Sequence, residues 1–186
     1  MEQEWTQLPT LVAIIQHPYM STIKYRNATQ KDLKIIVEIY NSTISSRMVT
    51  ADTEPLTVDN RQKWFEEHNS DKRPLWVIEN FNNDIIGWVS FQSFYGRAAY
   101  DATAEISIYL DTKQRGKGLG KEVLQYCIEN APKFGIKTLL GFIFSHNEQS
   151  LKLFRNFGFE DWETLPNVAL LDRQERCLKI LGKRIA

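Results

Sequence analysis

The chain has 186 residues, 42% of them hydrophobic, which suits one domain with a sizeable core. Basic and acidic residues cancel to a formal net charge of +0, which argues against a general nucleic-acid-binding surface. Cys127 and Cys177 lie far apart, and no stretch has the pattern of a secretory leader or a membrane span. We therefore expect a cytoplasmic protein from a reducing compartment, without a disulfide, a metal site, a nucleic-acid partner or a membrane partner.

Residues 1–21 are predicted to be an N-terminal extension, followed by one folded domain over 22–186. Apolar periodicity and turn formers predict, in chain order, a strand at 23–27, helices starting near Thr29 and Thr57, strands at 74–79, 85–94 and 103–110, a helix at 118–134, a strand at 138–144, a helix at 147–157 and two strands from Phe159 onward. This order predicts an α/β fold with a mixed sheet in a single domain.

A basic, glycine-rich turn, residues 114–121, joins the strand at 103–110 to the next helix. Unpaired N–H groups and the helix dipole make such a turn a favourable phosphate site, although many turns of this kind bind nothing. A Walker A loop would need glycine at Arg115 and a hydroxyl at Glu122, and the G-x-G-x-x-G pattern fails because its third glycine falls on Lys121 or Val123. The spacing present is Arg115-x-x-Gly118-x-Gly120.

The strand at 103–110 has one polar face, because side chains alternate along a strand and place Thr103, Glu105, Ser107 and Tyr109 together. A substrate channel would explain this row on a central strand, and an exposed sheet face is the alternative. Partial burial would raise the pKa of Glu105 towards that of a general base. A structural, ion-paired carboxylate is the alternative for this residue.

Several separated motifs share one resemblance. Arg115-x-x-Gly118-x-Gly120 resembles the acetyl-CoA loop, Q/R-x-x-G-x-G/A, of the GNAT N-acetyltransferase superfamily. Other segments resemble its phosphinothricin and methionine sulfoximine acetyltransferase branch, and the similarity covers about residues 23–182. These segments are Ile39-Tyr40-Asn41, Asp52-Thr53-Glu54-Pro55 with Arg61 and Trp64, Gly96-Arg97, Tyr100-Asp-Ala-Thr-Ala-Glu105-Ile-Ser-Ile-Tyr109, Asn147-x-x-Ser150 and Phe157-Gly158-Phe159.

The resemblance implies the GNAT fold and an N-acetyltransferase that uses acetyl-CoA without a metal. It implies that Glu105 removes the proton from the attacking amine. Strand amides at Ile108, Tyr109 and Leu110 would hold the pantetheine arm and the oxyanion. The pyrophosphate would be bound by Arg115, Gly116, Lys117, Gly118, Leu119, Gly120 and Lys121, with Asn147 and Ser150 along the cofactor. Asn147 could also serve as a helix cap.

The acceptor implied by the branch is the amino group of a small amino acid or analogue such as phosphinothricin or methionine sulfoximine. Arg97 and Arg61 could bind its anionic group, with Tyr95, Gly96 and Tyr100 at the pocket wall; surface charge and simple packing are the alternatives. Another amine, such as a protein N-terminus or a polyamine, and a non-catalytic acetyl-CoA sensor are the alternative functions. Relatives in this branch are commonly dimers, so a homodimer is expected.

Three positions depart from the pattern of the family. Phe154 stands where the family presents a tyrosine or histidine as a general acid, and Ile106 stands where many members of the branch have histidine. Residues 169–181 lack the tryptophan and aspartate often found near that end. No general acid is carried over to this chain, but a thiol with a pKa of about 8.5 can leave as its thiolate.

Overall fold

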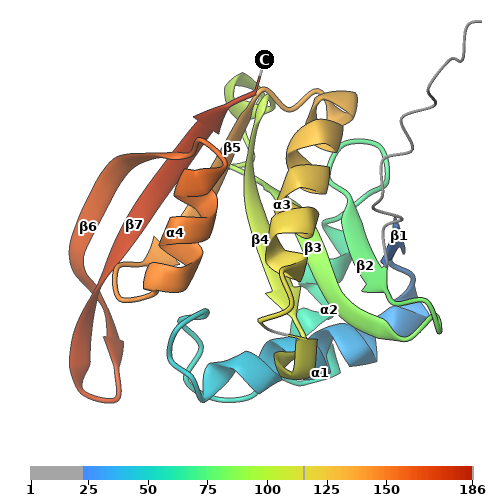
Figure 1. Ribbon diagram of the computed structural model, residues 1–186, viewed down its shortest axis with the longest axis horizontal. Helices are drawn as coiled ribbons and strands as arrows, with labels where there is room; N and C mark the ends of the chain where they lie inside the picture. The colour runs from blue at the N-terminus through green and yellow to red at the C-terminus, as the bar shows by residue number, and fades with distance from the viewer. Residues whose placement is uncertain (1–22, 115, 186) are drawn as a thin grey trace, which may run out of the picture.

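The computed structural model describes residues 23–114 and 116–185, so the predicted extension at 1–21 lies outside the described residues. The described strands form one seven-stranded sheet in the order β1-β2-β3-β4-β5-β7-β6 (Figure 1). The strands are β1 Lys24–Asn27, β2 Leu75–Glu79, β3 Ile85–Ser93, β4 Thr103–Leu110, β5 Thr138–Phe144, β6 Glu160–Leu171 and β7 Gln174–Arg184. The helices are α1 Leu33–Ile44, α2 Val58–Glu66, α3 Leu119–Asn130 and α4 Glu148–Asn156. The predicted mixed sheet in one domain is confirmed.

The strands β4 and β5 are parallel neighbours, connected through α3, whereas the other neighbouring strands are antiparallel. Their pairing begins at Thr103 and Thr138 and ends at Glu105 and Leu140, although both strands continue further. On its other side, β4 stays paired with β3 as far as Leu110. Among the described strands, none pairs with the β5-facing edge of β4 beyond Glu105, and the sheet opens there.

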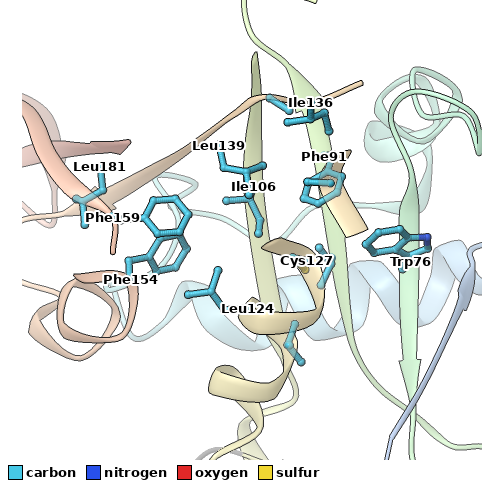
Figure 2. Packing of buried hydrophobic residues seen from close by; sticks show 14 of the residues in the cluster. Trp76, Phe91, Ile106, Leu124, Cys127, Ile136, Leu139, Phe154, Phe159 and Leu181 are labelled. Carbon is cyan, nitrogen blue, oxygen red and sulfur yellow. The ribbon is translucent and has the colours of Figure 1, made fainter. Parts of the chain in front are cut away.

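Apolar side chains fill both faces of the sheet. One core cluster includes residues of α3 and α4 as well as the central strands, and Figure 2 shows its members Leu124, Phe154 and Leu139. A second cluster joins α1 to β2 and β3 on the opposite face, and Tyr109 packs against it. The alternation predicted for β4 is confirmed, because Ile106 belongs to the first cluster and Tyr109 contacts the second.

Local sequence explains where the helices begin and end. The helix predicted to start near Thr57 is α2, and Thr57 caps it by accepting a hydrogen bond from the Asn60 backbone N–H at 3.2 Å. The helix predicted at 118–134 is shorter, because α3 ends at Asn130 and residues Ala131–Phe134 form a 3-10 turn. Pro132 explains the difference, since it has no N–H for the α-helical bond and its ring clashes with the preceding turn.

Candidate active site

A cavity of about 280 Å³ lies where β4 and β5 separate. Four regions of the chain contribute most of its wall: the segment after α1, the two diverging strands and the first turns of α4. The lining residues are Met48, Val49, Thr50, Ala51, Glu105, Ile106, Ser107, Ile108, Tyr109, Gly141, Phe142, Ile143, Phe144, Asn147, Ser150, Phe154 and Leu178. The opening of the sheet thus brings together segments far apart in the sequence.

Glu105 lies at the end of the β4–β5 pairing and lines this cavity. Its pKa is raised because burial penalises the carboxylate, and this effect is partly offset by a hydrogen bond from Ser107. The Ser107 hydroxyl is 3.5 Å from the carboxylate, so the contact is long and leaves Glu105 capacity to accept another proton donor. No described basic side chain forms an ion pair with Glu105, in contrast to the structural alternative considered from the sequence.

The structure places two of the three residues predicted to hold the pantetheine arm at the cavity. Ile108 and Tyr109 line the cavity, whereas Leu110 is not among the lining residues and packs beside Gly87 of β3. The Tyr109 ring stacks on Trp88 with 4.3 Å between ring centroids and 14° between planes. This stack helps to hold the C-terminal half of β4 against β3. The opposite edge of β4, which β5 leaves at Glu105, faces the cavity.

The glycine turn has the backbone shape that an anion site requires. Gly116 and Gly118 have φ angles of 76° and 80°, and a side chain at either position would point into open space. Gly118 is the N-cap of the 12-residue helix α3 and offers no side chain to satisfy the first N–H groups. These N–H groups and the open approach fit a pyrophosphate. Lys117 bonds to Gln114 at 2.8 Å, and Arg115 lies outside the described residues.

Asn147 and Ser150 both line the cavity, and Asn147 also caps α4. The Asn147 side chain accepts from the Ser150 backbone N–H at 3.1 Å and donates to the Met48 carbonyl at 2.9 Å. Asn147 therefore fixes the segment after α1 against α4 and shapes the cavity wall. The Phe154 ring is buried against Gly141, and a Cβ atom at Gly141 would lie 2.8 Å from that ring. No proton donor occupies the position of Phe154.

Arg61 belongs to α2, and its guanidinium packs over two aromatic rings. Its guanidinium is 4.2 Å from the Tyr40 ring centroid and 4.9 Å from that of Trp64, and it makes no hydrogen bond or ion pair with a described residue. The Tyr40 hydroxyl, which contacts Thr50, donates to Asp52. The Arg61 donors are thus available to a ligand. The sequence analysis did not assign the Tyr40–Asp52 contact, because it joins a helix to a following loop.

The other residues predicted to bind the acceptor lie in the loop after β3. Tyr95 is 76% exposed and Tyr100 is 43% exposed, and both rings contact Phe94. Arg97 is exposed as well. The structure does not bring Tyr95, Arg97 or Tyr100 to the 280 Å³ cavity. Gly96 lines a second cavity, of about 390 Å³, together with Arg73 and Gln92, which the sequence analysis missed.

Within residues 23–114 and 116–185, no cluster of His, Cys, Asp and Glu could hold a metal ion. Both cysteines are free, and burial raises the pKa of the Cys127 thiol. No helix in this part of the chain is long and apolar enough to cross a membrane.

The family model named Acetyltransferase (GNAT) domain matches residues 23–160. The chain belongs to the GNAT acetyltransferase family. It is 50% identical to YwnH of Bacillus subtilis (strain 168) over 161 residues, which cover 87% of this chain and 98% of the relative. YwnH has the provisional name phosphinothricin acetyltransferase. It is also 32% identical over 143 residues, 77% of this chain and 83% of the relative, to the L-methionine sulfoximine/L-methionine sulfone acetyltransferase of Pseudomonas paraeruginosa (strain DSM 24068 / PA7).

Solved structures agree with this assignment. A crystal structure provisionally described as a phosphinothricin N-acetyltransferase matches with a TM-score of 0.86 and 49% identity, covering 88% of this chain and 99% of that one. The yncA acetyltransferase from Salmonella typhimurium, solved with acetyl-CoA, matches with a TM-score of 0.80 and 26% identity, covering 89% and 95%. The predicted family, branch and fold are confirmed. The GNAT protein is an N-acetyltransferase whose co-substrate is acetyl-CoA.

Proposed function

We propose that this GNAT enzyme acetylates the amino group of a small amino acid or analogue of the phosphinothricin or methionine sulfoximine type. The observation that carries the proposal is the position of Glu105, a half-buried carboxylate at the point where the sheet opens. The names of the relatives support the acceptor class. Arg61 packs over the rings of Tyr40 and Trp64 and bonds to no residue in the described part of the chain, so it suits an acceptor that bears an anionic group.

The chemistry follows from the groups at the cavity. An ammonium has no lone pair, so Glu105 removes its proton, directly or through a water, and the raised pKa suits that task. The neutral amine then attacks the thioester carbonyl. As the tetrahedral intermediate collapses, the C–S bond breaks and the nitrogen releases its second proton to solvent. The Ile108 N–H points to the free edge of β4, whereas that of Tyr109 belongs to the β3–β4 ladder, so Ile108 stabilises the oxyanion, by about 3 kcal/mol if well placed. The thiolate of coenzyme A leaves without an acid at Phe154.

The roles of the remaining residues are part of the proposal. The turn from Gly116 to Lys121 holds the pyrophosphate, Ser150 and Asn147 lie along the cofactor, and Tyr95, Gly96, Arg97 and Tyr100 approach the acceptor from the loop after β3. A homodimer and a cytoplasmic location stay predictions from the sequence. One observation favours a second candidate: the apolar side chain of Phe154 also suits a non-catalytic acetyl-CoA sensor.

Release of thiol from acetyl-CoA, measured with a panel of amines, separates these functions. We expect turnover with L-methionine sulfoximine, L-methionine sulfone or L-phosphinothricin, and little with spermidine or a peptide bearing a free N-terminus. A sensor would bind acetyl-CoA in calorimetry and release thiol only at the background hydrolysis rate with every amine. Preference for spermidine or the peptide would replace the proposed acceptor class while leaving the acetyltransferase assignment intact.

A further inference from the structure

The second cavity, of about 390 Å³, lies next to the proposed catalytic base. Gln92 lines it, and Gln92 is the direct cross-strand partner of Glu105 in the antiparallel β3–β4 pair. Directly opposed residues share one face of a sheet, with Cβ atoms about 5 Å apart. The wall is completed by Glu67, His68, Arg73, Phe91, Ser93 and Gly96. Glu105 itself lines the first cavity, so the second cavity lies one strand away from the proposed base.

Arg73 is a buried cation on that wall, with only 6% of the residue exposed. Its Nε donates to the Ser93 hydroxyl at 2.9 Å, and its Nη1 and Nη2 donate to the carbonyls of Lys72 at 2.9 Å and Asp101 at 2.8 Å. All these acceptors are neutral, and no described carboxylate forms an ion pair with Arg73. A guanidinium has five N–H donors, so two remain beyond these bonds.

An uncompensated buried charge is costly, which makes Arg73 a candidate to bind an anion. Burial lowers its pKa, and the Asp101 charge only partly reverses this. Glu67 is an exposed carboxylate on the wall. His68 contributes a neutral ring: Nδ1 lies 2.8 Å from the Trp64 carbonyl, which can only accept, and Nε2 is buried without a partner among the described residues. Among the described residues that line this cavity, Arg73 is therefore the cationic side chain that can bind an oxyanion.

We propose that the second cavity binds an oxyanion of the acceptor amino acid, and that Arg73 is the residue that selects acceptors carrying one. This inference rests on the proposed function and deepens it. The α-carboxylate and the amine are attached to the same carbon, so a carboxylate held beside Gln92 and Arg73 places the amine next to Glu105. A phosphinate on the acceptor side chain has the same chemistry and is the other source of such an oxyanion.

Arg73 also has structural contacts, so the test must distinguish selection from support. Its bonds connect the start of β2 to Ser93 at the end of β3 and to Asp101 before β4. A purely structural role would affect every acceptor in the same way. A selecting role would affect acceptors that carry the oxyanion far more than matched neutral ones.

The experiment compares L-methionine sulfone with its α-carboxamide at saturating acetyl-CoA, in the wild type, Arg73→Met, Arg73→Lys and the control Lys72→Met. Lys72 is the exposed neighbour, so its substitution removes the same charge outside the cavity. We expect Arg73→Met to lower kcat/KM for the acid about 100-fold and to change that for the amide much less. Arg73→Lys should keep part of the preference, Lys72→Met should keep all of it, and acetyl-CoA affinity should be unchanged.

Equal losses for acid and amide, or no loss for the acid, would overturn the inference. L-Phosphinothricin separates the two sources: a selective loss with this substrate alone would assign the cavity to the phosphinate. If Arg73→Met does not fold, Gln92→Leu provides a second test and should produce a smaller loss that is still specific for the acid. If the wild type acetylates no amino acid, the proposed function fails, and calorimetry with L-methionine sulfone decides the inference separately. Binding that Arg73→Met weakens would support it, and absence of binding to the wild type would end it.

Discussion

At the scale of single residues, Glu105 could be selected from the sequence because a polar row on a central strand is unusual. Local alternation also placed Ser107 on the same face, and its hydroxyl lies 3.5 Å from the Glu105 carboxylate. Gln92 could not be found in this way, because it lies on another strand. Arg73 was missed for a related reason. An arginine before a proline has no local signal for burial, and its three acceptors come from both sides of the β3–β4 loop and from its own neighbour.

Glu105→Gln should lower kcat by at least about 100-fold at neutral pH, because the amide cannot accept the ammonium proton. Stopped-flow or steady-state thiol release measures the loss, and calorimetry should show unchanged affinity for acetyl-CoA. Glu175→Gln, an exposed carboxylate on β7, is the matched control and should retain full turnover. Unchanged turnover in Glu105→Gln would remove Glu105 from the role of base.

The pH profile of kcat/KM tests the same residue independently. Burial raises the pKa of Glu105, so its basic form should be lost as the pH falls through a value above the ordinary pKa of about 4.3. Because the folded state holds this proton more tightly than the unfolded state, ionised Glu105 opposes folding, and stability from this group falls as pH rises. Glu105→Gln should therefore abolish the acid limb of the profile and unfold no earlier than the wild type in thermal denaturation at neutral pH.

At the scale of elements, most helix and strand positions followed from the sequence, because periodicity and capping are local. Strands β4 and β5 have the predicted bounds, and α3 differs where Pro132 converts its end to a 3-10 turn. The glycine turn before α3 was also recognised locally, from spacing alone. Its suitability for an anion depends on the backbone angles at Gly116 and Gly118, which the structure supplies.

Gly118→Ala tests the turn and has a natural control in Gly135→Ala. Both glycines have positive φ angles, 80° and 71°, and a Cβ added at either position would meet no atom within 4 Å. Each substitution should lower the free energy of unfolding by about 1 kcal/mol through backbone strain. Only Gly118→Ala should also weaken acetyl-CoA binding, about 10-fold or more, because it lies at the α3 N-terminus. Equal affinities of the two variants in calorimetry would contradict the assignment of this turn to the pyrophosphate.

At the scale of the whole molecule, an ion-pair network ties the first strand to the sheet and to α1. Arg26 bonds to Asp32 at 2.7 and 2.9 Å and to Glu79 of β2 at 2.7 Å. Asp32 also accepts from the Thr29 backbone N–H at 2.7 Å. Bonding to Arg26 holds the pKa of Asp32 at about 2, below its ordinary value. This network joins β1, β2 and the start of α1, so it contributes to the stability of the fold.

Asp32→Asn should lower the free energy of unfolding at pH 7 by about 2 kcal/mol, a value reduced because Arg26 is partly exposed. The folded pKa is depressed, so this stabilisation is present above the unfolded pKa of about 3.9 and disappears as the pH falls towards about 2. Urea unfolding of both proteins from pH 7 to pH 2 should show the difference shrinking in that window. Asp161→Asn, which removes an exposed ion-pair partner on β6, should cost less than about 1 kcal/mol. A constant difference down to pH 2 would contradict this account of Asp32.

Local sequence was enough to assign the family, the order of the elements, the polar face of β4 and the spacing of the glycine turn. Each pattern depends on residues that are close together in the chain, and the family follows from several such motifs in the same order. The separation of β4 from β5 beyond Glu105, the cavity formed there and the buried position of Arg73 emerged only from the folded chain. They arise from packing between segments that are distant along the chain, and that packing leaves no periodic pattern in any one segment.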